Sequence, residues 1–145
     1  MTALLDTNIL LRIATPNHPM HTTARNAVSK LQADGVRLVL VPQIVYEYWV
    51  VATRPAKENG LGMTPLEAKQ ALDQFFETFS VLRDERGIFP IWQSLVVSAA
   101  VSGKNAHDTR LVAAMIRHKI GTIITFNVDD FKRFNPVSAI HPTNV

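Results

Sequence analysis

Acidic side chains stand at four places in the sequence that either lie among apolar residues or follow closely on an apolar strand segment. They are Asp6, after an apolar segment; Glu47, inside an apolar helical segment; Asp108, spaced three, four and seven residues from apolar side chains; and the pair Asp129 and Asp130. Burying a lone carboxylate is costly, and several carboxylates close together repel one another. A hard divalent cation relieves both effects, because Mg²⁺ and Mn²⁺ prefer oxygen ligands. The acids together therefore predict a metal site.

Two of these acids also have an explanation as helix caps. Asp6 either caps the helix that follows it or binds the metal. Asp108 either joins Asn105 in a capping arrangement or binds the metal. The sequence leaves both alternatives open, but a metal site accounts for every position at once.

The remaining acids have explanations that involve solvent or ion pairs. Glu47 either pairs with Arg54 or Arg110, or binds the metal. Asp129 and Asp130 are either solvated turn residues or ligands, and we expect at least one of them to be solvated.

Apolar strand segments alternate with helical segments along the chain. We expect strands at Thr2–Leu5, Val36–Val41, Thr122–Phe126 and Val137–Ile140; helices at Ile9–Ile13, His21–Asp34, Gln43–Thr53, Ile91–Ser102 and Ala106–His118; a helix capped at Thr64 with an apolar stripe to Phe79; and a helical turn at Asp129–Phe134. The helix Gln43–Thr53 is apolar almost all round, so we expect it to be buried. The alternation predicts a parallel sheet covered on both faces, with ligands at the carboxyl ends of its strands.

Composition restricts the class of protein. The 145 residues, 47% hydrophobic and 19% charged, suit one ordered domain, residues 1–145. The absence of cysteine excludes disulfides, thiolate catalysis and zinc–thiolate sites, and no H-E-x-x-H pattern supports a zinc hydrolase. No apolar run approaches the roughly 20 residues of a membrane span, and no signal peptide is evident, so we expect a cytoplasmic protein. The net charge of +3 is compatible with a polyanionic substrate.

Four short motifs follow one another in a set order. They are Leu4-Leu5-Asp6-Thr7-Asn8, Pro42-Gln43-Ile44-Val45-Tyr46-Glu47, Ala106-His107-Asp108-Thr109-Arg110-Leu111-Val112-Ala113-Ala114 and Thr125-Phe126-Asn127-Val128-Asp129-Asp130-Phe131. The ordered set resembles the PIN domain, and the size of the chain resembles the toxin ribonucleases of VapBC-type toxin–antitoxin pairs. This resemblance implies a three-layer α/β/α fold with a central, mostly parallel sheet.

The resemblance also implies the chemistry: hydrolysis of RNA phosphodiester bonds with Mg²⁺ or Mn²⁺. Carried over, Asp6, Glu47 and Asp108 are the catalytic metal ligands. Asn127 stands where the family has Asp or Asn and joins the catalytic set, while Asp129 or Asp130 supplies the missing charge.

Further roles follow from the same resemblance. Thr7, Asn8 and Thr125 would position the metal ligands or the substrate, and the basic candidates for phosphate contacts are Arg110, Lys104, Lys132 and Arg133. We expect an antitoxin partner whose tail enters the acidic cleft, and a homodimer to which the first helices contribute apolar surface. Two alternatives remain: a PIN-like nuclease of RNA processing or DNA structure cleavage, and a non-catalytic module that binds RNA or protein.

Overall fold

A fully parallel, five-stranded sheet lies at the centre of the computed structural model, which describes all 145 residues. Its strands are β1 (Thr2–Leu5), β2 (Arg37–Leu40), β3 (Ser80–Val81), β4 (Thr122–Ile124) and β5 (Ser138–Ile140). They lie in the order β3-β2-β1-β4-β5, and each neighbouring pair is parallel. The strand order therefore reverses at β1, because β2 lies on one side of it and β4 on the other.

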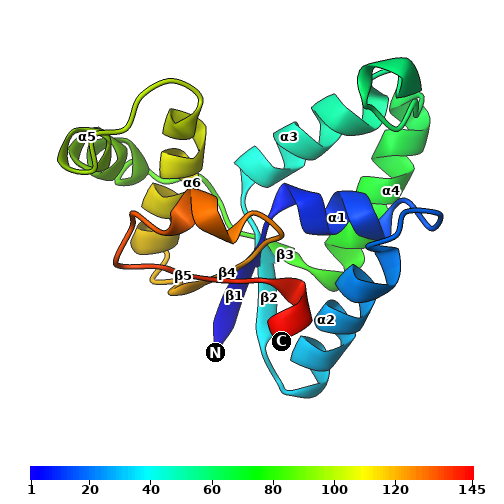
Figure 1. Cartoon of the computed structure of the whole chain (residues 1–145), viewed down its shortest axis with the longest axis horizontal. Helices are drawn as coiled ribbons and strands as arrows, with labels where there is room; N and C mark the ends of the chain where they lie inside the picture. Colours follow the sequence, from blue (N-terminus) through cyan, green and yellow to red (C-terminus); the bar gives the residue numbers. More distant parts are fainter.

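Helices cover both faces of the sheet. They are α1 (Thr7–Ile13), α2 (His21–Ala33), α3 (Pro42–Thr53), α4 (Pro65–Thr78), α5 (Ile88–Ser98) and α6 (Asn105–Arg117), joined by the 3₁₀ helices η1 (Ala56–Glu58), η2 (Val128–Phe131) and η3 (Pro142–Asn144). Figure 1 shows α1 to α4 on one side of the sheet and α5 and α6 on the other. The expected three-layer α/β/α fold with a parallel sheet is thus confirmed.

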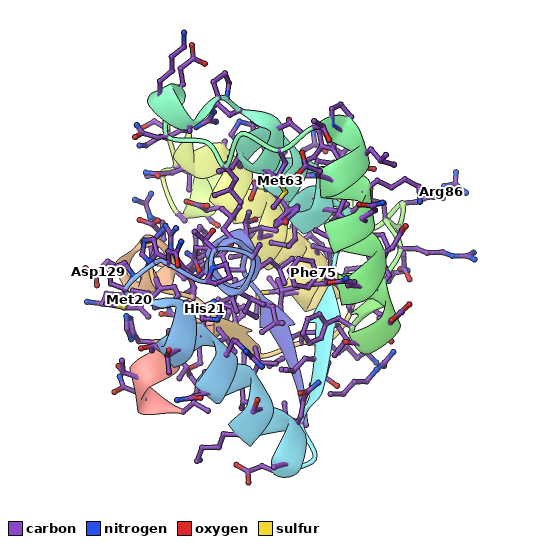
Figure 2. All side chains as sticks on the ribbon, turned by 90° about the vertical axis from the view of Figure 1, so that its right-hand side faces the viewer. Met20, His21, Met63, Phe75, Arg86 and Asp129 are labelled. Carbon is purple, nitrogen blue, oxygen red and sulfur yellow. The ribbon has the colours of Figure 1, made fainter.

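The core forms where these helices pack on the sheet. A single cluster of 31 buried apolar residues joins all the layers, and residues 3–5 of β1 are fully buried because the strand is covered on both faces. Phe75 of α4 points into the interior, and its ring meets that of Tyr48 edge to face at a centroid distance of 5.5 Å. Arg86 points outward into solvent on the same side of the molecule (Figure 2).

The cap predicted at Thr64 is present at the start of α4 and forms a full capping box with Glu67. The Thr64 hydroxyl accepts a hydrogen bond from the backbone N–H of Glu67, and the Glu67 carboxylate accepts one from the backbone N–H of Thr64. No helix in the structure is both long enough and apolar enough to cross a bilayer.

Helix α5 differs from its predicted bounds at both ends. It begins at Ile88, before Pro90, because the first turn of a helix has no intrahelical partners for its N–H groups and so tolerates proline. It ends at Ser98 rather than near Gly103. Ala100 takes the left-handed conformation at φ 50°, and the N–H of Val101 bonds back to the helix.

The prediction that α3 is buried all round was wrong. Ile44, Tyr48 and Ala52 face the core, but Tyr46 is 63% exposed and Val50 is 55% exposed. The sequence prediction also missed β3, whose two residues are both exposed at the sheet edge and carry no hydrophobic pattern.

Candidate active site

The carboxyl end of β1 lies at the point where the strand order reverses. Parallel sheets bind ligands at such a point, because the loops leaving adjacent strands run to opposite faces and open a crevice. Asp6 follows β1 directly and Thr125 follows β4. Glu47 approaches from α3 on one face of the sheet, and Asp108 from α6 on the other.

Asp6 is buried and uses both carboxylate oxygens. Oδ1 accepts a hydrogen bond of 2.7 Å from the backbone N–H of Thr7, so Asp6 does cap α1. Oδ2 accepts one of 2.7 Å from the Thr125 hydroxyl and a longer one of 3.4 Å from Asn8 Nδ2. Capping therefore accounts for one oxygen only, while the other is fixed in the crevice by groups from α1 and the end of β4.

Thr125 is completely buried and its hydroxyl makes three hydrogen bonds. It donates to Asp6, and it accepts from Asn8 Nδ2 at 3.2 Å and from the backbone N–H of Asn127 at 3.0 Å. Asn8 Oδ1 in turn accepts a hydrogen bond of 3.2 Å from the backbone N–H of Phe126. Strand β4 itself ends at Ile124, before the predicted end at Phe126. The contacts of Asn8 and Thr125 thus position Asp6, and Thr125 has no surface that could touch a substrate.

Glu47 is also bound through both oxygens. Oε2 accepts a hydrogen bond of 2.8 Å from the Thr7 hydroxyl, and Oε1 accepts one of 2.9 Å from Gln43 Nε2. Thr7 therefore connects α1 to α3, and its side chain acts on Glu47. Gln43 is a site residue that the sequence analysis passed over. The signal for it was a polar side chain four residues before Glu47 on an apolar helix.

The ion-pair explanation for Glu47 is wrong. No ion pair joins Glu47 to Arg54 or Arg110, and the Arg110 guanidinium bonds instead to Asp84 at 3.0 Å. Glu47 thus has no cationic partner in the structure, and its hydrogen bonds come from the neutral side chains of Thr7 and Gln43.

Asp108 lies half-buried in the first turn of α6. The helix cap is at Lys104 and includes no side-chain hydrogen bond, and Asn105 is inside the helix. The capping explanation for Asp108 is therefore wrong. The Asp108 carboxylate accepts no hydrogen bond. The charged groups that shift its pKa are mainly the neighbouring acids Asp130, Asp6 and Glu47.

The two acids of η2 have different surroundings. Asp129 is exposed and forms an i,i+3 ion pair with Lys132, and Figure 2 shows it at the outer edge of the molecule. Asp130 is the acid whose charge acts on both Asp6 and Asp108. One of the pair is therefore a solvated turn residue, as expected, and the position of Asp129 does not support its assignment as a ligand.

Burial and crowding raise two of the carboxyl pKa values. Burial raises the pKa of Asp6 to about 6, with smaller contributions from Glu47 and Asp130, although the bonds from Thr125 and Thr7 oppose the shift. Burial likewise raises the pKa of Asp108 to about 6, aided by the charges of Asp130, Asp6 and Glu47. The acids that converge on the crevice therefore destabilise one another's charged forms.

A divalent cation fits this donor set in chemistry. The donors are carboxylate oxygens, which suit Mg²⁺ or Mn²⁺, and the Asp108 carboxylate lacks any partner. No three acidic side chains are close enough to form a metal-binding group in this structure. Asn127, also assigned to the site, is exposed at the rim and its side chain caps nothing.

The basic candidates for phosphate contacts divide into paired and unpaired residues. Lys132 pairs with Asp129, and Arg110 pairs with Asp84. Lys104 and Arg133 are exposed and form no ion pair.

Residues 2–129 match the sequence profile of the PIN domain, so the chain belongs to the PIN domain family. Among characterised proteins it is similar to ribonuclease VapC48 of Mycobacterium tuberculosis, with 24% identity over 144 residues, which is 98% of either chain.

Two solved structures are similar in fold. VapBC2 from Rickettsia felis, bound to a DNA fragment from its promoter, gives a TM-score of 0.73 at 17% identity, covering 97% of this chain and 98% of that one. VapBC-1 from nontypeable Haemophilus influenzae gives a TM-score of 0.70 at 19% sequence identity, and the match covers 99% of each chain.

Proposed function

We propose that this chain is a metal-dependent ribonuclease and the toxin of a VapBC-type toxin–antitoxin pair, formed by one PIN domain over residues 1–145. The observation that carries the proposal is that Asp6, Glu47 and Asp108, from three separate elements, lie near enough for the charges of the other acids to raise the pKa of Asp108. The likeness to ribonuclease VapC48 over almost the whole length of both chains supports the toxin assignment.

In this proposal Asp6, Glu47 and Asp108 hold the cation, with Asp130 adding negative charge from the rim. When bound, Mg²⁺ or Mn²⁺ supplies a water of lowered pKa for hydrolysis and neutralises charge on the phosphate. The protein contributes the positions: Thr125 and Asn8 fix Asp6, and Thr7 fixes Glu47.

The RNA backbone would lie across the rim of the crevice. Asn127 and the unpaired cations Lys104 and Arg133 are exposed there or on adjoining elements. Lysine and arginine contacts to phosphate position a nucleic acid without reading its sequence. Their removal should therefore weaken binding of all RNA sequences alike.

An antitoxin partner is part of the same proposal, because the structural neighbours from R. felis and H. influenzae are VapBC proteins. We infer that a tail of the antitoxin enters the acidic crevice and places a cation among the carboxylates. Such a cation would compensate the same charges as the metal and exclude it.

A homodimer also belongs to this proposal, but not through the first helices. The apolar side chains of α1 and α2 are buried, for example Leu10 and Leu31. The exposed large apolar side chains of the helices lie on α3, α4 and α5 instead, including Tyr46, Leu66 and Phe89. Sedimentation at micromolar concentration tests this part, and a strict monomer would contradict it.

The substrate class is tested with the purified chain, Mg²⁺ and matched single-stranded RNA and DNA oligonucleotides. We expect cleavage of the RNA and not of the DNA. Cleavage of DNA would favour a nuclease of another pathway, and binding of RNA without any cleavage would favour a non-catalytic module. Mapping the cleavage sites on total RNA would then identify the target.

A further inference from the structure

Gln43 is the buried side chain that joins the helices of two proposed metal ligands. Its Nε2 donates a hydrogen bond of 2.9 Å to Glu47 Oε1 and a second of 2.8 Å to the backbone carbonyl of His107. Gln43 and Glu47 belong to α3, whereas His107 directly precedes Asp108 on α6. One amide therefore connects the Glu47 carboxylate with the turn that carries Asp108.

The orientation of this amide is fixed by a third contact. Gln43 Oε1 accepts a hydrogen bond of 3.3 Å from Arg110 Nη1, while Arg110 Nη2 bonds to Asp84 Oδ1 at 3.0 Å. Both N–H groups of the amide donate to oxygen atoms. If the amide were flipped, its oxygen would face the oxygens of Glu47 and His107, and neither contact would be a hydrogen bond. The chain of contacts thus runs from Asp84 through Arg110 and Gln43 to Glu47.

We propose that Gln43 sets the spacing between Glu47 and Asp108, and that Arg110, held by Asp84, acts through Gln43 instead of contacting RNA. The proposal rests on the proposed function, because it concerns the cation that those acids would hold. Without a cation the acids repel one another. The uncharged Gln43 amide, which donates hydrogen bonds both to Glu47 and to the turn of α6 before Asp108, opposes the separation of these two acids without adding charge between them.

The planar guanidinium of Arg110 is suited to bind a phosphate through two parallel hydrogen bonds. In the structure its two terminal nitrogens are already divided between Gln43 and Asp84. A lysine at this position has a single ammonium and cannot reproduce both contacts from one planar group.

The test measures Mn²⁺ binding to the RNA-free protein by electron paramagnetic resonance, beside the Mg²⁺-dependent rate and KM of RNA cleavage. For Gln43→Met and Arg110→Met we expect the Mn²⁺ dissociation constant to rise about 10-fold, the effect typical of groups that orient metal ligands. The KM for RNA should stay near that of the wild type. Gln70→Met, on the exposed face of α4, is the matched control and should change neither value.

Two further variants separate positioning from RNA contact. The double variant Gln43→Met with Arg110→Met should resemble Gln43→Met alone, because Arg110 acts through Gln43. Asp84→Asn should weaken Mn²⁺ binding, whereas a phosphate-binding Arg110 freed from Asp84 would lower the KM. Loss of about one unit from the salt slope of RNA binding in Arg110→Met would likewise overturn the proposal.

Each remaining outcome has a defined meaning. If the wild type and all variants bind Mn²⁺ equally, the spacing role of Gln43 is wrong while the proposed function stands. If the wild type binds no Mn²⁺, the proposed function fails and the spacing role fails with it. Thermal melts check that each variant is folded. If Gln43→Met does not fold, the same measurements on Arg110→Met test the proposal, because the Arg110 side chain is partly exposed and its replacement should not prevent folding.

Discussion

The Thr125 hydroxyl donates a 2.7 Å hydrogen bond to Asp6 Oδ2, and this contact joins the carboxyl ends of the two strands on either side of the crevice. Thr125 is fully buried and Asp6 is 8% exposed, so the bond is shielded from water. A hydrogen bond to a charged group in such surroundings is stronger than one between neutral groups. The bond lowers the pKa of Asp6 against the effect of burial.

Thr125→Val should therefore reduce both stability and cleavage. Valine keeps the shape but leaves Asp6 Oδ2 and the N–H of Asn127 without this partner, and an unsatisfied buried group costs about 1–3 kcal/mol. Cleavage should fall about 10-fold or more, because Asp6 loses its orientation and ionises less readily. Thr125→Ser keeps the hydroxyl and is the control. Equal cleavage by the valine and serine variants would contradict this role.

Asp108→Asn should abolish cleavage yet stabilise the metal-free protein. The substitution removes one charge from a group of mutually repelling acids, and we expect a gain of about 1–2 kcal/mol after screening by solvent. For a chain of this size that corresponds to a melting temperature higher by about 2–8 °C. Added Mg²⁺ should raise the melting temperature of the wild type more than that of the variant. A variant less stable than the wild type without metal would disprove the repulsion.

The stability of the metal-free protein should depend on pH through Asp6 and Asp108. Their folded pKa values are raised from 3.8 to about 6, so the folded state binds more protons than the unfolded state within that window. The free energy of unfolding contributed by these groups must then fall as pH rises from about 4 to 6, and the full penalty applies above 6. Melts at pH 5 and pH 7 test this: the advantage of Asp108→Asn over the wild type should shrink at pH 5.

Tyr48→Phe should stabilise the protein without affecting cleavage. The Tyr48 hydroxyl is fully buried and is the one buried side-chain polar atom with no hydrogen-bond partner. Phenylalanine keeps the edge-to-face contact with Phe75 and removes the stranded group, for an expected gain of about 1 kcal/mol. Thermal melts and the RNA cleavage rate measure the two effects. A destabilised Tyr48→Phe would indicate that the hydroxyl has a partner in solution.

The sequence predicted the elements that depend on strong local patterns. The strand Thr2–Leu5 and the capping box at Thr64 appear as expected, because an apolar strand and a reciprocal cap are both local features. The predicted bounds of α5 were wrong at both ends. Pro90 lies within the first turn, where proline is tolerated, and the left-handed conformation of Ala100 follows the end of the helix before the expected stop near Gly103.

The candidate site was predictable only in part. Acids in apolar surroundings predicted Asp6, Glu47 and Asp108 as candidate site residues, because the cost of burying them can be inferred from the neighbouring residues. The role of Gln43 was not predictable, because its contacts to His107 and Arg110 bridge 64 and 67 residues of sequence. Pairing of exposed charges, such as Asp129 with Lys132, also depends on how a short turn directs each side chain.

The most direct test of the central claim is the rate of RNA cleavage as a function of Mg²⁺ concentration, for the wild type and Asp108→Asn side by side. We predict a wild-type rate that rises to saturation with Mg²⁺ and falls to the uncatalysed level in excess EDTA, and a variant rate that stays at that level throughout. Full wild-type cleavage in EDTA, or the same Mg²⁺ dependence in both proteins, would contradict a cation held by Asp6, Glu47 and Asp108.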